Sequence, residues 1–389
     1  MKNDKTPAIR FKGFTEAWEQ CRLGDVFKEY SEKGHVEFPA LTIIQGGGTI
    51  RRDESDRNLQ FDKGNLSNHK LVKKGDFIVH LRSFEGGLEK STENGLISPA
   101  YHTFHAVNCD SSFYYYYFRS TKFIDVDLKP HVYGIRDGRS IDIDGMKTIN
   151  IPFTKEEEQI KIGNFIDTID TLITLHQRKC DVLMNIKKSL LEKMFPTNGD
   201  DKPRIRFKGF TEAWEQRKIT ELGKIFIGLV TTMTAHYTEE GALLIRNSDI
   251  KDCRFEFNEN KIFLEKSFAS AYESRMHQIG DVITVHTGDV GTSAVISENE
   301  YKSIGFATIV TRPYKNVISS NYLCTFLNTE KHKRWAVAIS TGDGRTNYNL
   351  GDYYELIVPV PSIEEQKKIA KIISNLNSLI TLHQRKEKS

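Results

Sequence analysis

Few residues of this sequence combine the types and the spacing that catalysis or metal binding requires. His102 and His105, in the segment HTFH, could ligate a metal ion, but no Cys or carboxylate cluster joins them. Gly46–Gly48 could cradle a phosphate with backbone N–H groups, yet no helix start follows, which favours a flexible turn. Asp137 and Asp343 belong to Asp-Gly-Arg turns, whose geometry explains the Asp-Gly pair without catalysis. We therefore expect no metal site and no catalytic centre.

Signature motifs of several enzyme classes are also absent from the sequence. There is no Pro-Pro pair, so the (N/D)PPY segment with which adenine methyltransferases hold a flipped base is missing. Neither the phosphate loop GxxxxGK(S/T) nor the zinc motif HExxH occurs. We predict a non-catalytic binding protein that holds no cofactor of its own.

An internal repeat organises the chain. IRFKGFTEAWEQ occurs at Ile9–Gln20 and again at Ile205–Gln216, and LITLHQRK occurs at Leu172–Lys179 and again at Leu379–Lys386. Between these segments, IPFTKEEEQIKI aligns with VPVPSIEEQKKI, and KKGDFIV with QIGDVIT. The ends of each repeat match far better than its middle. The sequence is therefore a tandem duplication with two divergent central blocks.

A long helix is predicted after each block. From Glu157 to Phe195, apolar residues recur at steps of four and three, which is typical of a coiled coil, and Pro196 ends the pattern. This stretch is about 58 Å long as a helix, and the second helix, Ile363–Lys388, is about 39 Å long. If the second helix returns along the first, the pair is antiparallel with pseudo-two-fold symmetry. The overlap is close to the roughly 34–36 Å of one DNA turn, which suggests a bipartite DNA site.

The composition is that of a soluble protein. Hydrophobic residues make up 38% and charged residues 28%, and no apolar run approaches the length of a membrane span. The five cysteines are scattered and never form CxxC, which predicts free thiols in a reducing cytoplasm. The formal net charge of +3 permits nucleic-acid binding without requiring it.

Together these features resemble the specificity subunit of type I restriction–modification systems. The residues that carry the likeness are FKGFTEAWEQRK (Phe207–Lys218), the Gly-Asp turn before a strand, the IPFTKEEEQ and VPVPSIEEQ junctions, and the LITLHQRK helices. The resemblance implies a subunit without catalytic activity, whose two recognition domains each read half of an interrupted double-stranded DNA site. It also implies two methyltransferase subunits that use S-adenosylmethionine, and two restriction subunits, joined through them, that use ATP and Mg²⁺. No membrane is involved.

The predicted fold is α+β, with two α/β target-recognition domains in tandem, each followed by a long helix. We place the first domain at residues 1–153 with a shared segment at 7–20, and the first helix at 154–196. The second domain covers 197–361 with a shared segment at 203–216, and the second helix covers 362–389. The alternative is a coiled-coil adaptor that does not touch DNA. A scaffold would have no reason to diversify its blocks, whereas here the blocks diverge.

Loops with polar residues beside glycine are the best candidates for DNA contacts. Arg suits guanine and Asn suits adenine in the major groove, while Arg, Thr and Tyr also hold phosphates. Any one of these residues could instead be an ordinary solvated side chain that does not touch DNA. The prediction that these loops contact DNA is therefore stronger for the group than for each single residue. The candidates are Arg51, Arg52, Arg82, Tyr133, Arg136 and Arg139 in the first block, and Arg246, Asn247, Thr287, Thr292, Arg345, Asn347 and Tyr348 in the second.

Overall fold

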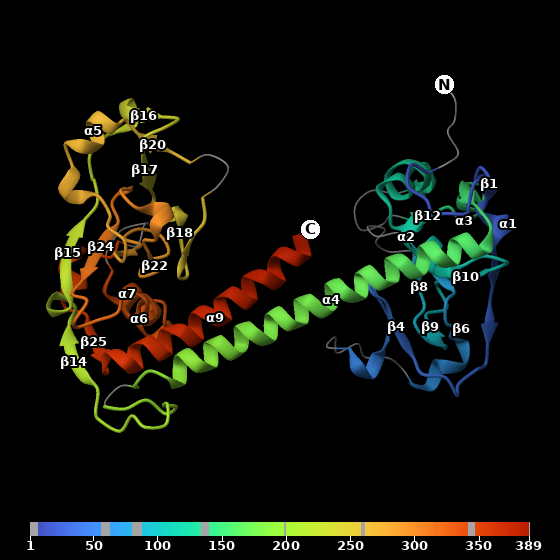
Figure 1. Cartoon of the computed structure of the whole chain (residues 1–389). Coiled ribbons are helices and arrows are strands. Elements are labelled where there is room, and N and C mark those ends of the chain that lie inside the picture. The colour runs from blue at the N-terminus through green and yellow to red at the C-terminus, as the bar shows by residue number, and fades with distance from the viewer. Residues whose placement is uncertain are drawn as a thin grey trace. The chain divides into compact units, whose positions relative to one another are not determined.

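The computed structural model describes residues 7–55, 63–79, 88–133, 140–197, 200–257, 261–340 and 347–388. The chain divides into two compact units, Met1–Thr174 and Leu175–Ser389, and the division falls inside the long helix α4 (Glu156–Lys193). Each unit combines short strands and helices (Figure 1). Across the described ranges, no helix is long and apolar enough to cross a membrane.

The largest sheet described in the first unit has four antiparallel strands. In spatial order they are β2 (Phe27–Tyr30), β10 (His102–Ala106), β7 (Phe77–Val79) and β8 (Glu89–Lys90). Smaller sheets are β3 (Glu32–Lys33) with β6 (Lys70–Val72) and β9 (Gly95–Ile97); β4 (Leu41–Ile44) with β5 (Gly48–Arg51); β11 (Val132–Tyr133) with β12 (Ser140–Ile141); and β1 (Glu19–Arg22) with β13 (Asn150–Phe153). Helices are α1 (Leu23–Val26), α2 (Ser111–Phe118), α3 (Ile143–Lys147) and the π-helical turn Lys122–Leu128.

Aromatic side chains fill the core beside this sheet. Phe27, Phe77 and Phe118 are at most 1% exposed, and their ring centroids are 5.1, 5.3 and 5.4 Å apart in edge-to-face pairs. Tyr114 of α2 packs on Phe27, and its hydroxyl donates to Pro152 O at 2.9 Å. Large buried rings contribute most of the apolar area of such a core. The helix α2 is therefore anchored both on the sheet and on β13.

The second unit contains two four-stranded sheets among its described residues. One has the antiparallel order β15 (Gly223–Ile227), β24 (Ile309–Pro313), β21 (Val282–Thr284) and β22 (Ser293–Val295). The other has the order β16 (Tyr237–Thr238), β20 (Phe263–Leu264), β17 (Ala242–Ile245) and β23 (Ile304–Gly305), with β17 and β23 parallel. The remaining elements are β14 (Glu215–Lys218) with β25 (Ile357–Val360), β18 (Ile250–Lys251) with β19 (Arg254–Phe255), α5 (Lys266–Ser270), α6 (Ser320–Leu327), α7 (Glu330–Ile339), α8 (Leu350–Tyr354) and α9 (Ile363–Lys388).

The two units share a set of corresponding elements in the same chain order. The sheet β15-β24-β21-β22 corresponds to β2-β10-β7-β8, the pair β14-β25 corresponds to β1-β13, and α6 and α8 correspond to α2 and α3. In each unit a Pro-containing strand leads directly into the long helix, α4 or α9. This confirms the predicted α+β class, with two units in tandem and a long helix after each.

The matching ends of the repeat are joined inside each unit by the same salt bridge. Arg10 donates from Nε and Nη2 to Glu158 at 2.5 and 2.7 Å, and Arg206 donates in the same way to Glu365 at 2.8 and 2.9 Å. Both carboxylates are at most 1% exposed. Burial opposes the ionisation of Glu158, but hydrogen bonds from Arg10 and Thr154 outweigh it and hold the pKa of this carboxyl below its ordinary value. The segment IRFKGF is thereby tied to the start of each long helix.

The glutamine that follows each glutamate makes a second repeated contact. Gln159 Oε1 accepts a hydrogen bond from Asp110 N at 2.9 Å, and Gln366 Oε1 accepts one from Ser319 N at 2.8 Å. Both glutamines are fully buried, and Asp110 and Ser319 are the residues that precede α2 and α6. Internal packing therefore accounts for part of the sequence identity at the ends of the repeat.

In the second unit, the C-terminal part of α4 packs against α9. The Nδ1 atoms of His176 and His383 are 3.0 Å apart, and Phe195, just after α4, packs in one core with Ile369 and Ala370 near the start of α9. From His176 to Phe195 along the chain, the partners on α9 run backward from His383 to Ile369, so the helices are antiparallel (Figure 1). The pseudo-two-fold symmetry between the units stays a prediction.

Candidate nucleic-acid interface

In the second unit, three of the predicted loops meet at the end of the sheet strands. They follow β17, follow β21 and precede α8. His286 N donates to Asn247 Oδ1 at 2.8 Å, and Thr287 Oγ1 donates to Asn347 Oδ1 at 2.9 Å. Asn247, His286, Thr287 and Asn347 are all half-buried, and we call them the polar cluster. The structure therefore brings Asn247, Thr287 and Asn347 together as one group.

Each asparagine of the polar cluster has a different capacity for further contacts. Asn247 Nδ2 lies 3.4 Å from Phe306 O and 3.3 Å from Ala307 O, so its amide also holds the loop after β23. Ala307 has a positive φ of 47°, and this strained backbone places its carbonyl beside Asn247. For Asn347 Nδ2 the described residues supply no acceptor. An amide with free donors is the group that pairs with adenine in a major groove.

His286 is a member of the polar cluster that residue type did not single out. Its Nδ1 lies 2.8 Å from Thr287 Oγ1, and burial lowers the pKa of His286 below its ordinary value. The imidazole is therefore neutral near pH 7 and adds no positive charge. The signal that could have revealed it was its place directly before Thr287 in the loop HTGD.

Arg246 lies next to the polar cluster and is held by an ion pair. Its Nε and Nη2 donate to Asp249 at 3.0 and 2.8 Å, and Asp249 is only 2% exposed. The guanidinium itself is partly exposed. The ion pair with Asp249 thus fixes the position of the guanidinium, while part of its surface stays exposed to a ligand.

Thr292 and Tyr348 do not reach the surface. Thr292 is 1% exposed and its hydroxyl donates to Asp289 at 2.7 Å. Tyr348 is fully buried, and its ring packs edge-to-face against Trp335 and Tyr353. Both side chains support the loops from inside, so we leave them out of the proposed interface.

In the first unit, the glycine turn Gly46–Gly48 binds a carboxylate of the same chain. Gly46 N and Gly48 N donate to Glu89 at 2.7 and 3.2 Å, and Arg119 Nη1 donates to it at 3.1 Å. Gly48 has φ of 73°, and a Cβ there would lie 2.5 Å from Lys90 O, so this position requires glycine. The backbone N–H groups of the turn therefore bind the buried Glu89 carboxylate, and they are not available to a phosphate.

The two arginines after this turn have different surroundings. Arg51 donates to Glu93 from Nε and Nη2 at 3.0 and 2.8 Å, and its side chain is 48% exposed. Arg52 Nε donates to Leu41 O at 3.1 Å and is half-buried. Arg51 is thus the better placed of the two for a ligand, while Arg52 holds the β4–β5 hairpin.

Tyr133, the last residue of β11, is 59% exposed. It remains available for a contact from the surface. The other predicted contacts, Arg82, Arg136, Arg139 and Arg345, lie outside the described residues, as do Asp137 and Asp343.

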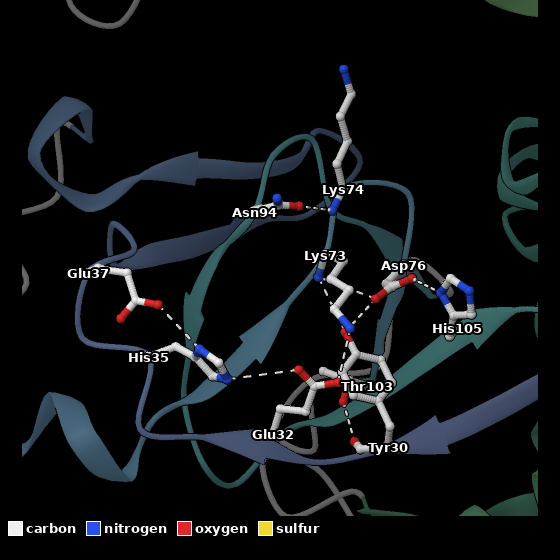
Figure 2. A network of polar contacts seen from close by, with 10 residues as sticks. All are labelled: Tyr30, Glu32, His35, Glu37, Lys73, Lys74, Asp76, Asn94, Thr103 and His105. Atoms are coloured by element: carbon white, nitrogen blue, oxygen red, sulfur yellow. Dashed lines mark hydrogen bonds and ion pairs between the residues drawn. The ribbon is translucent and has the colours of Figure 1, made fainter.

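The aspartate of the Gly-Asp turn, Asp76 or Asp281, is buried in each unit. Asp76 is 2% exposed and accepts from Lys73 N and from the Tyr30 hydroxyl, while His105 Nδ1 lies 2.7 Å from its other oxygen (Figure 2). In the second unit Asp281 accepts from Arg312 Nε at 2.8 Å. Burial and the Asp76 hydrogen bond raise the pKa of Tyr30, which stays protonated and donates. These aspartates fix the turn that leads into β7 or β21, and so they are structural.

The two histidines of HTFH have separate carboxylate partners. His105 pairs with Asp76, whereas His102 Nδ1 lies 2.6 Å from Glu29 Oε1. Among the residues with described positions, no three His, Cys, Asp or Glu side chains gather as a metal site would require. Each histidine therefore has a local role in the sheet.

The leucines of LITLHQRK form a second candidate surface, on the helices. Leu172 and Leu175 of α4 are 49% and 58% exposed, and Leu379 and Leu382 of α9 are 45% and 49% exposed. Between them on α9, Ile380 is 9% exposed. The duplicated motif thus presents the same two leucines to solvent in both copies, which is the pattern of a binding surface present twice.

Comparison with known proteins connects this architecture with one family. A family model described as the type I restriction modification DNA specificity domain matches residues 211–389. The chain is 22% identical to the type I restriction enzyme MjaVIII specificity subunit of Methanocaldococcus jannaschii, over 96% of this chain and 89% of that protein. It is 27% identical over 138 residues to the EcoBI specificity subunit of Escherichia coli, covering 36% of this chain and 29% of that protein.

Solved structures share the fold. The S subunit of a type I restriction–modification system from M. genitalium matches with a TM-score of 0.62 and 16% identity, over 98% of this chain and 95% of that chain. A chain from a study of the assembly of a type I system matches with a TM-score of 0.51 and 17% identity, over 98% of this chain and 94% of that chain. The family model covers most of the second copy of the repeat, and the first copy contains a corresponding four-stranded sheet, strand pair and long helix in the same order.

Proposed function

We propose that the chain is a specificity subunit of a type I restriction–modification system and that it reads DNA in two halves, one with each unit. The observation that carries the proposal is a repeated framework with divergent loops. The same sheet and the same Arg–Glu bridge recur in both units, while the loops at the strand ends differ. A repeated scaffold with different loops suits two different half-sites.

In the second unit, the polar cluster and Arg246 form the reading surface. Asn347 Nδ2 has no acceptor among the described residues, and Thr287 and Arg246 supply a hydroxyl and a guanidinium in the same region. In the first unit, Arg51 and Tyr133 are the exposed candidates. Direct contacts of such groups with base edges supply sequence discrimination, while further polar contacts hold the phosphates.

The long helices act as the spacer between the two half-sites. The helix α4 has 38 residues, which gives about 57 Å at the usual rise of an α-helix. Its packing against α9 makes this element stiff in the second unit. A stiff spacer fixes the number of base pairs between the half-sites, because the recognition surfaces cannot slide relative to the duplex.

Two methyltransferase subunits dock on the duplicated surfaces, and two restriction subunits join through them. The exposed leucine pairs on α4 and α9 support this stoichiometry, since identical patches favour two copies of one partner. The chain itself supplies recognition without catalysis. S-adenosylmethionine then belongs to the methyltransferase subunits, and ATP with Mg²⁺ belongs to the restriction subunits.

Two alanine variants test the assignment of one half-site to each unit. We expect Asn347→Ala to weaken binding about tenfold through the second half-site only, and Arg51→Ala to do so through the first only, since one good base contact contributes about 1–3 kcal/mol. Binding of the complex with its methyltransferase subunits is measured on duplexes in which one half of the target is scrambled. Arg254→Ala is the matched control, because Arg254 forms an exposed ion pair with Glu256 and is not one of the proposed DNA contacts. Equal losses at both half-sites, or none at either, would remove these loops from the interface.

A further inference from the structure

Two of the five cysteines lie against each other in the second unit. The Sγ atoms of Cys253 and Cys324 are 3.6 Å apart, although the residues are 71 positions apart in the sequence. All five cysteines are free thiols. A disulfide joins its sulfur atoms at about 2.05 Å, so a movement of about 1.5 Å would convert this contact into a bond.

The two thiols differ in their access to solvent. Cys253 lies in the turn between β18 and β19, is half-buried, and has a left-handed backbone with φ of 58°. Cys324 lies in α6 and is 1% exposed. Both cysteines line a groove of about 940 Å³ that Ser374 and Asn377 of α9 also line. A small oxidant can therefore approach Cys253 through the groove, while Cys324 lies behind it.

The surroundings hold the pair in place. Cys253 N donates to Ser293 O at 3.0 Å, which fixes the turn, and Cys324 Sγ donates to the same carbonyl at 3.3 Å. Asn328 Nδ2 lies 3.4 Å from Cys253 Sγ and 3.5 Å from Cys324 Sγ. The hydrogen bond with Cys253, together with burial, raises the pKa of the Cys324 thiol. Cys253 is thus the thiol that meets an oxidant first, and Cys324 is placed to react with the product.

We propose that Cys253 and Cys324 form a redox-modification site that hydrogen peroxide converts into a disulfide. The Cys253 thiolate attacks the outer oxygen of the peroxide, the O–O bond breaks, and the thiol proton leaves with the released hydroxide as water. Cys253 is then a sulfenic acid. The Cys324 sulfur attacks the Cys253 sulfur, the S–S bond forms, the S–O bond breaks, and a second water leaves. Two thiols are oxidised by two electrons, and one peroxide is reduced to two waters.

The disulfide would restrain a turn that contacts the helix pair. Asp252, next to Cys253, forms an ion pair with Lys187 of α4 at 2.7 Å. The same turn therefore touches α4 through Asp252 and α6 through Cys253. Oxidation would fix it covalently to α6, and so would stiffen the connection between the sheet region and the helix pair within the second unit.

The test is thiol counting on the full chain before and after treatment with hydrogen peroxide. The reduced chain should react with five equivalents of N-ethylmaleimide under denaturing conditions, and the oxidised chain with three, as measured by intact mass. Peptide mapping should locate the bond between Cys253 and Cys324. Oxidation should also raise the midpoint of thermal unfolding, because the bond closes a loop of the unfolded chain.

Two variants serve as controls. Cys253→Ser should lose both the cross-linked peptide and the rise in the unfolding midpoint, whereas Cys180→Ser, which removes a thiol of α4, should keep both. The proposal is overturned if a peroxide dose that oxidises Cys21 or Cys109 leaves Cys253 and Cys324 reactive toward N-ethylmaleimide. It is equally overturned if Cys253 is found linked to another chain instead of to Cys324.

Discussion

At the residue scale, a buried arginine–glutamate bridge stabilises each unit. Glu158 is fully buried and Glu365 is 1% exposed, and each accepts two hydrogen bonds from its arginine. A buried ion pair adds little beyond an apolar pair of the same shape, but removal of one partner leaves an uncompensated charge. The bridge therefore makes the shared segment and the helix start depend on each other.

Loss of either arginine should destabilise its own unit. We expect Arg206→Ala to lower the free energy of unfolding of the second unit by about 3–5 kcal/mol, and Arg10→Ala to lower that of the first, because the glutamate stays buried without its partner. Urea titration followed by hydrogen exchange measures each unit separately. Arg217→Ala is the matched control: its pair with Glu221 is exposed, and the change should be below about 1 kcal/mol. A loss as small as that of the control would show that the bridge is dispensable.

In the second unit, residue type predicted which loops come together better than it predicted which of their side chains are exposed. Asn247, Thr287 and Asn347 meet in one cluster, but Thr292 and Tyr348 are buried. Nothing in the type of a Thr or Tyr in a glycine-containing loop shows whether its side chain points to the core or to solvent. Similarly, the spacing of Gly46–Gly48 could not show that Glu89, far along the chain, fills the turn, because that contact depends on the folded sheet.

At the element scale, α7 depends on a buried neutral histidine. His332 Nδ1 donates to Leu327 O at 2.7 Å and its Nε2 lies 3.2 Å from the Tyr348 hydroxyl, which makes Nε2 the acceptor. Burial lowers the pKa of His332 to about 4 from an ordinary value of 6.5. The folded chain therefore resists protonation that the unfolded chain accepts.

Stability of the second unit should fall as the pH drops from 6.5 toward 4. In that window the unfolded state binds the proton and the folded state does not, so the contribution of His332 to the free energy of unfolding decreases by roughly 3 kcal/mol in total. Urea unfolding at a series of pH values measures the slope. His332→Gln should reduce the slope and leave a remainder from His277, whose pKa burial lowers to about 3. An unchanged slope in the variant would contradict the assignment.

The helix surface gives a second prediction at this scale. Leu175→Glu and Leu382→Glu should each leave folding unchanged, because both leucines are more than 45% exposed, but each should weaken the docking of one methyltransferase subunit at least about tenfold. The ratio of subunits in the assembled complex, measured by native mass spectrometry, should fall from two per chain to one. Val337→Glu on α7, at a position that is 55% exposed, is the control and should keep the ratio at two. If neither leucine variant changes the ratio, docking lies elsewhere.

At the scale of the whole molecule, the sequence was most informative where a pattern extends over many residues. The second long helix has the predicted bounds, Ile363–Lys388, and the first runs from Glu156 to Lys193 where Glu157 to Phe195 was predicted. The duplication also predicted the matching sheets. The internal Arg–Glu and Gln contacts were not foreseen, because identical segments alone do not show whether they match for docking or for packing.

The central claim is that two units on a helical spacer read two separated half-sites. The most direct measurement is to co-express the chain with its cognate methyltransferase subunit and to map adenine methylation across a host genome by single-molecule sequencing. We predict a two-part motif with half-sites centred about ten base pairs apart and roughly five to seven unspecified pairs between them. A single contiguous motif would contradict the spacer, and a complete lack of methylation would favour the adaptor that does not touch DNA.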